Sequence, residues 1–365
     1  VASNNLPMAP NSDHDHLRAL KKFDDTKAGV KGIIDSGITS IPTIFHHPPE
    51  AFAPLAPLST DISIPVIDLL GHRPEVVIAV KAAVETLGFF LVVNHGVPEA
   101  TMSDTLAAVK GFHEGPVKEK EPYYTRSEGR RVRYSGNADL FRSPAAKWRD
   151  TLYIDDADQL VEEVLPPMCR GAMPEYTRLM RQLGHVLFGL MSEALGLQHD
   201  YMEEETGCLD ALLLGCHYYP ACPEPHLTLG AVRHSDASFL TVVLQDGTVD
   251  GLQLLVHDNK QQQVWVKVPA MAGALAVNVG DFLQLVSNDR FKSVVHRVVS
   301  NSAGPRVSVV CFFRANMATL CGPVVVDGSG PPRYRTVKAE ELFGSSRTML
   351  KSALSPQTAL DYLRL

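Results

Sequence analysis

The sequence lacks several motifs that define common protein classes. Its six cysteines include no Cys-x-x-Cys pair, so neither a zinc-thiolate site nor a thioredoxin-like site is predicted. No apolar run approaches the roughly 18 residues of a membrane span. A glycine-rich phosphate-binding loop is absent, and so is an internal repeat. These absences argue against a zinc-thiolate, membrane-spanning, nucleotide-binding or repeat protein.

The sequence also has no excess of positive charge. Its formal net charge is −7 and its sequence pI is about 6.1, which argues against a nucleic-acid-binding surface. Hydrophobic residues make up 45% and charged residues 21% of 365 residues, which is typical of a soluble globular protein with a large core. Without an evident secretory leader, we expect reduced thiols and a cytoplasmic location. We also expect a monomer that acts on a small molecule, without nucleic-acid or membrane partners.

One stretch of the chain carries a pattern with chemical meaning. His234 and Asp236 lie two residues apart, so on a β-strand both side chains would point to the same face. His296 follows further along a β-rich run. The His-x-Asp pair alone is weak evidence, because a single histidine in a sheet is more often a satisfied core residue. Two imidazoles and one carboxylate together form the facial ligand set of a non-haem ferrous ion, which leaves three positions open.

A second pattern lies just beyond His296. Arg306, Ser308 and Phe312 share one face of an extended run, as His217 and Tyr219 do on another run. The planar, permanently charged guanidinium of arginine suits the far carboxylate of a 2-oxo dicarboxylic acid. We therefore predict an Fe(II) site made by His234, Asp236 and His296, and a cosubstrate site made by Arg306, Ser308 and Tyr219.

These motifs, together with strings along most of the chain, resemble the plant 2-oxoglutarate- and Fe(II)-dependent dioxygenases. The strings are residues 23–32 (FDDTKAGVKG), 41–49 (IPTIFHHPP), 64–69 (IPVIDL), 88–97 (GFFLVVNHGV) and 147–152 (KWRDTL). Within the family, the sequence is most similar to the 1-aminocyclopropane-1-carboxylate oxidase homologues, near the grass dioxygenases that hydroxylate a benzoxazinoid glucoside (DIBOA-glucoside). One position departs from the family, whose usual Asn-Tyr-Tyr-Pro is His217-Tyr-Tyr-Pro here. We interpret His217 as an inward-facing polar neighbour of the site, not as an iron ligand.

The strand pattern predicts a mixed α+β fold around a jelly-roll (cupin-like) double-stranded β-helix with flanking helices. Short strands are expected at 212–219, 239–245, 252–257, 264–268, 274–279, 293–298, 307–313 and 324–326. Helices are expected at 16–27, 74–87, 99–114 and 173–195, with short ones at 339–343, 346–353 and 358–363. We divide the chain into an N-terminal arm (1–60), an α/β region (61–205), the jelly-roll core (206–330) and a C-terminal helical cap (331–365). The cap follows from the resemblance.

Substrate contacts are predicted from two parts of the chain. Phe312, Phe239 and Leu254 offer an apolar lining near the iron. The arginine-rich segment 123–146 is either a solvated loop or a segment at the mouth of the site, where the family places variable substrate contacts. Its candidates are Tyr134, Arg131 and Arg133. Such a site suits a plant specialised metabolite with an aromatic or heterocyclic body and several oxygen atoms.

The resemblance implies that the protein hydroxylates a C–H bond and requires Fe(II), 2-oxoglutarate and O2, with ascorbate as a reductant in assays. Beyond the three metal ligands we predict no catalytic residue. One alternative is the ascorbate-using reaction of a 1-aminocyclopropane-1-carboxylate oxidase. Another is a jelly roll that binds a small molecule without catalysis. The complete ligand set and the Arg-x-Ser motif favour an enzyme that uses 2-oxoglutarate.

Overall fold

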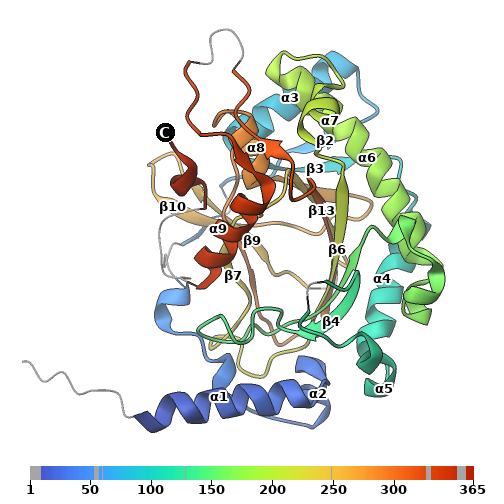
Figure 1. Ribbon diagram of the computed structural model, residues 1–365, viewed down its shortest axis with the longest axis vertical. Helices are drawn as coiled ribbons and strands as arrows, with labels where there is room; N and C mark the ends of the chain where they lie inside the picture. The colour runs from blue at the N-terminus through green and yellow to red at the C-terminus, as the bar shows by residue number, and fades with distance from the viewer. Residues whose placement is uncertain are drawn as a thin grey trace, which may run out of the picture.

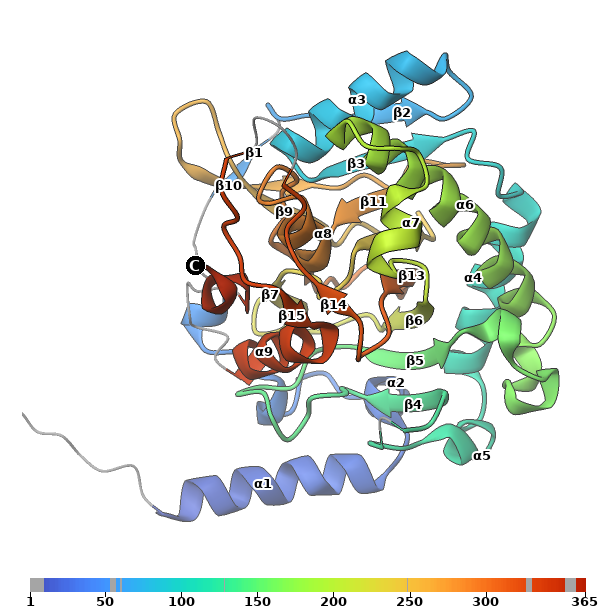
Figure 2. The ribbon, with the colours of Figure 1, turned by 45° about the horizontal axis from the view of Figure 1, so that its top comes forward.

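The computed structural model describes residues 10–52, 57–59, 61–127, 129–247, 249–325, 330–351 and 359–365. Two β-sheets form the centre of the molecule, and helices cover the outer face of the larger sheet (Figure 1). Figure 2 shows α3, α4 and α6 along one side of that sheet, α1 below it, and α9 on the opposite side of the barrel.

The core is a jelly roll, as the sequence predicts. The larger sheet has the order β2-β3-β11-β8-β13-β6-β5-β4, and the smaller sheet has the order β1-β10-β9-β12-β7. Strand β7 is absent from the predicted list, and it ends at His234. The jelly-roll strands are β6 (Ala211–Tyr219), β7 (Leu229–His234), β8 (Leu240–Gln245), β9 (Leu252–His257), β10 (Gln263–Lys267), β11 (Leu275–Val279), β12 (His296–Val299) and β13 (Arg306–Arg314).

Additional strands extend both sheets beyond the jelly roll. Parallel β2 and antiparallel β3 join one end of the larger sheet, and the hairpin of β4 and β5 joins the other end. Strand β5 begins two residues after Trp148. The bounds are β1 (Leu58–Ser59), β2 (Val66–Asp68), β3 (Phe89–Val93), β4 (Val132–Gly136) and β5 (Asp150–Asp155).

The helices bury the outer face of the larger sheet. The wide apolar stripe of α6 packs against β6 and against α3 and α4, and these elements share the largest apolar cluster of the protein. The predicted helices at 74–87, 99–114 and 173–195 are thus confirmed with small shifts in their ends. The bounds are α3 (Arg73–Thr86), α4 (Glu99–Glu114), α5 (Val117–Lys120), α6 (Ala172–Leu195), α7 (Tyr201–Thr206) and α8 (Asp281–Val286), with short 3-10 helices η3 (Glu121–Tyr123), η4 (Ala157–Gln159), η5 (Glu162–Val164) and η6 (Pro167–Cys169).

Strand alternation separates this helix-covered core from the interior between the sheets. On β13, Val307, Val309, Cys311 and Phe313 belong to the helix-side cluster. The intervening side chains of Arg306, Ser308, Val310 and Phe312 therefore face the other way, toward the smaller sheet. Val310 packs against a second apolar cluster, which includes Tyr219, Leu254 and Val298.

The N-terminal arm folds against the free end of the larger sheet. It comprises α1 (Pro10–Asp25), α2 (Gly29–Asp35), η1 (Thr43–Phe45) and η2 (Pro49–Phe52). A third apolar cluster joins Phe23 and Phe45 of the arm to Trp148, which lies two residues before β5. The buried carboxylate of Asp150 accepts hydrogen bonds from the backbone N–H groups of Val30 and Lys31, each at 2.8 Å.

This attachment requires glycine at position 29. Gly29 has φ +69°, and a Cβ there would lie 2.3 Å from Oδ1 of Asp150. Glycine alone combines a left-handed backbone with such a close approach at no steric cost.

The C-terminal part differs from the prediction. Residues 324 and 325 form no strand, and residue 326 lies outside the described residues. A small sheet of β14 (Leu320–Cys321) and β15 (Val337–Lys338) leads instead into α9 (Ala339–Lys351), which replaces the two predicted helices at 339–343 and 346–353. The final segment, η7 (Ala359–Leu363), buries Leu360 and Leu363, and Arg364 beyond it forms an ion pair with Asp289.

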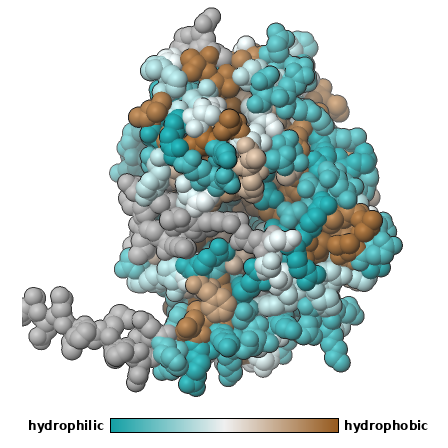
Figure 3. All heavy atoms as spheres, in the orientation of Figure 1, coloured by the Kyte–Doolittle hydropathy of each residue, from teal (hydrophilic) through white to brown (hydrophobic). Residues whose placement is uncertain are grey.

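All six cysteines are buried and unpaired, as expected of reduced thiols. Burial raises the pKa of Cys208 and of Cys169 to about 12, which keeps both thiols protonated. Within the described part of the chain, none of the helices has the length and apolar character needed to cross a bilayer. On the face shown in Figure 3, exposed apolar groups are interspersed among hydrophilic ones.

Candidate metal centre and cosubstrate site

The structure brings together His234, Asp236 and His296. Strand pairing places His296, the first residue of β12, directly opposite His234, the last residue of β7. Asp236 lies two residues past the end of β7, in the connection to β8, and not on a strand as its spacing suggested. Oδ1 of Asp236 is 3.6 Å from Nε2 of each histidine, and one ligand atom from each residue lies within 4.8 Å of the others. The three donors converge on one point.

Backbone carbonyls fix the orientation of both imidazole rings. Nδ1 of His234 is 2.8 Å from the carbonyl oxygen of Val232, and Nδ1 of His296 is 3.1 Å from that of Val294. Each Nδ1 therefore carries the proton and donates it, which leaves the lone pair of Nε2 directed toward Asp236. Burial, together with the charge of His296, lowers the pKa of His234 to about 3. The ring is thus neutral, as a metal ligand must be.

The carboxylate of Asp236 is held by two polar side chains that the sequence reasoning did not identify. Its Oδ2 accepts hydrogen bonds from Oγ1 of Thr241 at 2.8 Å and from Nδ2 of Asn278 at 2.9 Å. Burial opposes ionisation, but the two histidines and these hydrogen bonds lower the pKa of Asp236. Asn278, a polar residue within the apolar run of β11, was the only sequence signal for this contact.

This donor set fits a divalent non-haem iron. Ligands that lie about 2 Å from one ion at right angles to one another are roughly 3 Å apart, so the observed separations of 3.6 Å bring the donors close enough to share one ion. Two imidazole nitrogens and one carboxylate oxygen would hold the ion and leave part of its coordination shell free for a chelating cosubstrate. Oδ1 of Asp236 and the two Nε2 atoms are the atoms that would hold the iron.

A buried arginine lies on the same interior surface. The guanidinium of Arg306 donates to Oγ of Ser308 at 3.1 Å and to Oε1 of Gln245 at 2.8 Å, and its Nε has no hydrogen-bond partner. Its Cζ is 5.0 Å from the ring centroid of Tyr219. Among the described residues Arg306 forms no ion pair with a carboxylate, although it is only 2% exposed. A buried cation of this kind is suited to a carboxylate supplied by a ligand.

His217 lies beside this arginine but outside the metal centre. Strand pairing places it opposite Ser308 on one side and Thr151 on the other. Its Nδ1 is 3.0 Å from Oγ1 of Thr151. Burial and the neighbouring charges of Arg149 and Arg306 lower the pKa of His217 well below its usual value, so the ring is neutral. It is an inward-facing polar neighbour, in agreement with the sequence interpretation.

The predicted substrate residues separate into two groups. Phe312 lies on the face of β13 that carries Arg306, and Leu254 pairs directly with His296. Phe239 faces the helix side instead, where it packs against Phe188 and stacks on Phe282 at 5.3 Å. Its expected place beside the iron is wrong, because it precedes β8 in the helix-side core.

The arginine-rich segment also differs from the prediction. Tyr134 is fully buried on β4 under α4, with its hydroxyl 3.3 Å from the carbonyl oxygen of Ala28, so it is not at the mouth of a site. Arg133 forms an ion pair with Asp155. Arg131 donates to backbone carbonyl oxygens and lies 3.6 Å from the carboxylate of Asp156. These arginines connect the ends of β4 and β5, so their cations are already compensated.

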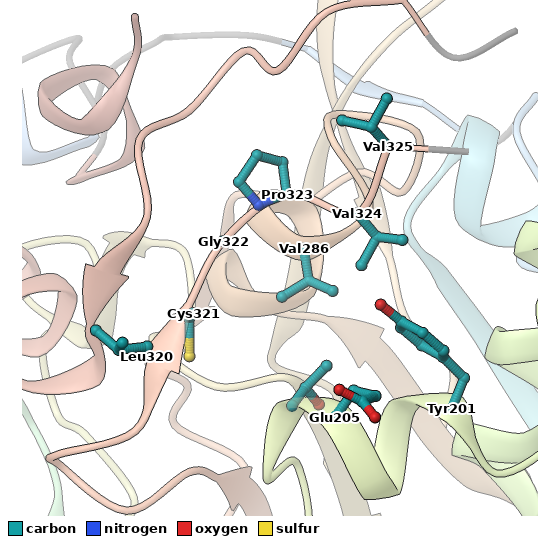
Figure 4. Close-up of a pocket in the computed structure, with 10 residues that line it drawn as sticks. Tyr201, Glu205, Val286, Leu320, Cys321, Gly322, Pro323, Val324 and Val325 are labelled. Carbon is teal, nitrogen blue, oxygen red and sulfur yellow. The ribbon is translucent and has the colours of Figure 1, made fainter. Parts of the chain in front are cut away.

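A cavity of about 330 Å³ lies elsewhere in the molecule (Figure 4). It is bounded by α7, by α8 and by the segment around β14, with Tyr201, Glu205, Val286, Cys321 and Val324 among its lining residues. None of the three candidate metal ligands contributes to it. The cavity is thus distinct from the metal centre.

The fold and this site define a non-haem iron oxygenase. The 2OG-Fe(II) oxygenase superfamily model matches residues 211–315, and the model described as non-haem dioxygenase in morphine synthesis N-terminal matches residues 64–167. With these matches and the relatives below, the chain belongs to the plant 2OG-Fe(II) oxygenase superfamily, and it is a dioxygenase that uses Fe(II) and 2-oxoglutarate.

Similar proteins cover nearly the whole chain. "1-aminocyclopropane-1-carboxylate oxidase homolog 1" of Arabidopsis thaliana is 46% identical over 92% of this chain and 93% of its own. "Deacetoxyvindoline 4-hydroxylase" of Catharanthus roseus is 40% identical over 96% of this chain and 92% of its own. The solved structure of JOX2 in complex with 2OG, Fe and JA superposes with a TM-score of 0.74 at 28% identity, covering 90% of this chain and 98% of that chain.

Proposed function

We propose that this protein hydroxylates a C–H bond of a plant specialised metabolite, using the metal centre of His234, Asp236 and His296. The observation that carries the proposal is the buried guanidinium of Arg306, which lies beside the complete ligand set and has no carboxylate partner among the described residues. Bound iron and 2-oxoglutarate supply the oxidative chemistry, in which O2 gives one atom to the substrate and one to succinate, with release of carbon dioxide.

The residues of the chain bind and orient the reactants. Arg306 holds the far carboxylate of 2-oxoglutarate through its planar fork, and Ser308 and Tyr219 bind beside it. Phe312 and Leu254 supply apolar surface for the substrate near the iron. Six unpaired thiols support a reducing compartment such as the cytosol, and we propose that the protein is a monomer.

For the substrate we propose an aromatic or heterocyclic compound with several oxygen atoms. A benzoxazinoid glucoside is the first compound to test, because the N-terminal strings of the chain resemble the enzymes that hydroxylate it. The 40% identity to deacetoxyvindoline 4-hydroxylase supports hydroxylation of a plant metabolite more generally.

A second candidate is the ascorbate-using reaction on 1-aminocyclopropane-1-carboxylate. It is favoured by several relatives at 41% to 46% identity that are called homologues of that oxidase. This reaction would not require 2-oxoglutarate, whereas the proposed hydroxylation would.

The decisive experiment measures cosubstrate use. Purified protein is loaded with Fe(II) under ascorbate and offered a benzoxazinoid glucoside, its aglycone, a phenolic acid or 1-aminocyclopropane-1-carboxylate, with and without 2-oxoglutarate. We expect succinate release that depends on both iron and 2-oxoglutarate, and a product heavier by one oxygen atom. Ethylene formation without 2-oxoglutarate would instead establish the second candidate.

A further inference from the structure

A second arginine belongs to the interior surface that carries the metal centre. Arg149 directly precedes β5, in which Leu152 and Ile154 pack into the helix-side core. Thr151 and Tyr153 face the other way, where Thr151 bonds His217 and the ring of Tyr153 contacts the same imidazole edge-on. Arg149 lies two residues before Thr151 and therefore shares its face. The register between β5 and β6 ends at Asp150 and Tyr218, and the guanidinium of Arg149 hydrogen-bonds the next residue of β6, Tyr219.

Arg149 has no counter-ion of its own. Its Nε is buried without a hydrogen-bond partner, and within the described ranges its guanidinium forms no ion pair. Arg133 and Arg314 on neighbouring strands both bind Asp155. Asp139, a carboxylate whose charge reaches Arg149, is already bound by Nζ of Lys147 at 2.5 Å.

The missing counter-ion of Arg149 matters when the charges of the site are counted with iron and 2-oxoglutarate bound. The two positive charges of a ferrous ion and the one of Arg306 are balanced by Asp236 and by the two carboxylates of 2-oxoglutarate. The imidazole of His217 is buried and neutral, because burial lowers its pKa, so it adds no charge. The cation of Arg149 is left uncompensated in a partly buried position, which is costly unless a ligand supplies an anion.

We propose that Arg149 binds an anionic group, a carboxylate, on the substrate itself. Tyr219 lies between the two arginines, so the substrate anion would occupy the β5 side of the interior surface while 2-oxoglutarate occupies the β13 side. Thr151 and His217 are placed to bind further oxygen atoms of the same molecule. This inference rests on the proposed oxygenase function and narrows its substrate class to aromatic acids.

The test compares aromatic carboxylic acids with their own methyl esters. Iron-loaded enzyme is offered cinnamic, indole-3-acetic and 4-hydroxyphenylacetic acids, each ester and a neutral aromatic glucoside, and succinate release above the substrate-free background is measured. We expect kcat/KM to favour at least one acid over its ester by about 10- to 100-fold, the range for hydrogen bonds to a charged group. Arg149→Gln should abolish that preference, and Arg149→Lys should retain part of it. Because Arg149 hydrogen-bonds Tyr219, Arg149→Gln should change the KM for 2-oxoglutarate by no more than Tyr219→Phe does.

The matched control is Arg178→Gln, which removes an exposed arginine paired with Glu175 on α6. It should retain the acid preference. The inference is overturned if every acid is used no better than its ester or than the glucoside. It is also overturned if Arg149→Gln keeps the acid-to-ester ratio of the wild type, or if it raises the KM for 2-oxoglutarate more than Tyr219→Phe does. Absence of iron-dependent succinate release from the wild type would overturn the proposed function itself. If Arg149→Gln unfolds at a lower temperature, Arg149→Lys and the acid-to-ester ratio of the wild type still decide the question.

Discussion

Replacing Thr241 by valine should weaken metal binding without touching a metal ligand. Thr241 and Asn278 donate to Oδ2 of Asp236, and these two bonds direct Oδ1 toward the histidines. Valine has the shape of threonine but cannot donate, so the carboxylate loses one of the two bonds that orient it. A hydrogen bond to an ionised group contributes about 1.5–3 kcal/mol, which corresponds to roughly 10- to 100-fold in a dissociation constant. The range agrees with the effect typical of residues that orient metal ligands.

The assay is an anaerobic titration of metal-free protein with Fe(II), or with Mn(II) as a redox-stable substitute. Thr177→Val provides a matched control, because it removes the same hydroxyl from another buried position, where the acceptor is the neutral carbonyl oxygen of Met173. Thr241→Val should raise the dissociation constant by about 10- to 100-fold relative to this control. Equal dissociation constants for the two variants would refute the idea that Thr241 orients Asp236.

Three further predictions follow from the same geometry. His234→Ala, Asp236→Ala and His296→Ala should each abolish turnover while circular dichroism remains native, and full activity with iron bound in any of them would disprove the ligand set. Arg306→Lys should raise the KM for 2-oxoglutarate by at least about tenfold, since lysine keeps the charge but cannot replace both contacts of the fork, whereas Ser308→Ala and Tyr219→Phe should each cost only ~0.5–1.5 kcal/mol. His113 is fully buried, and burial lowers its pKa to about 3. The unfolded chain therefore binds a proton at this histidine more tightly than the folded chain does, and stability is lost as the pH falls below about 6.5. Urea unfolding should show that, between pH 7 and pH 5, His113→Gln loses about 2 kcal/mol less stability than the wild type, and equal losses would contradict the assignment.

The sequence predicted the metal centre because its chemistry depends on residue types more than on exact geometry. His234 and Asp236 were identified by a two-residue spacing that assumes a strand, yet β7 ends at His234 and Asp236 is oriented by side-chain hydrogen bonds. Thr241 and Asn278 are ordinary polar residues in apolar strands, so their role appears only when β8 and β11 are paired.

The substrate residues were harder to predict. One face of the larger sheet packs against helices and the other lines the interior of the jelly roll, and both faces are apolar. Composition therefore could not place Phe239 or Tyr134, and both belong to the helix-side core. Nothing in the sequence singled out Arg149, which lies within residues 147–152, one of the stretches that resemble the family. Its importance depends on the ion pairs of its neighbours, which a sequence does not reveal.

The position of β5 links the N-terminal arm to substrate recognition. Asp150 points outward and holds the backbone of Val30 and Lys31, while Arg149, the residue before it, faces the interior. Because side chains alternate along a strand, the arm and the interior surface depend on the same register. Shortening the arm would leave Asp150 as a buried carboxylate without these two donors and would remove the packing around Trp148. From the proposed role of Arg149, we therefore expect an N-terminal truncation to alter the selectivity of the enzyme as well as its length.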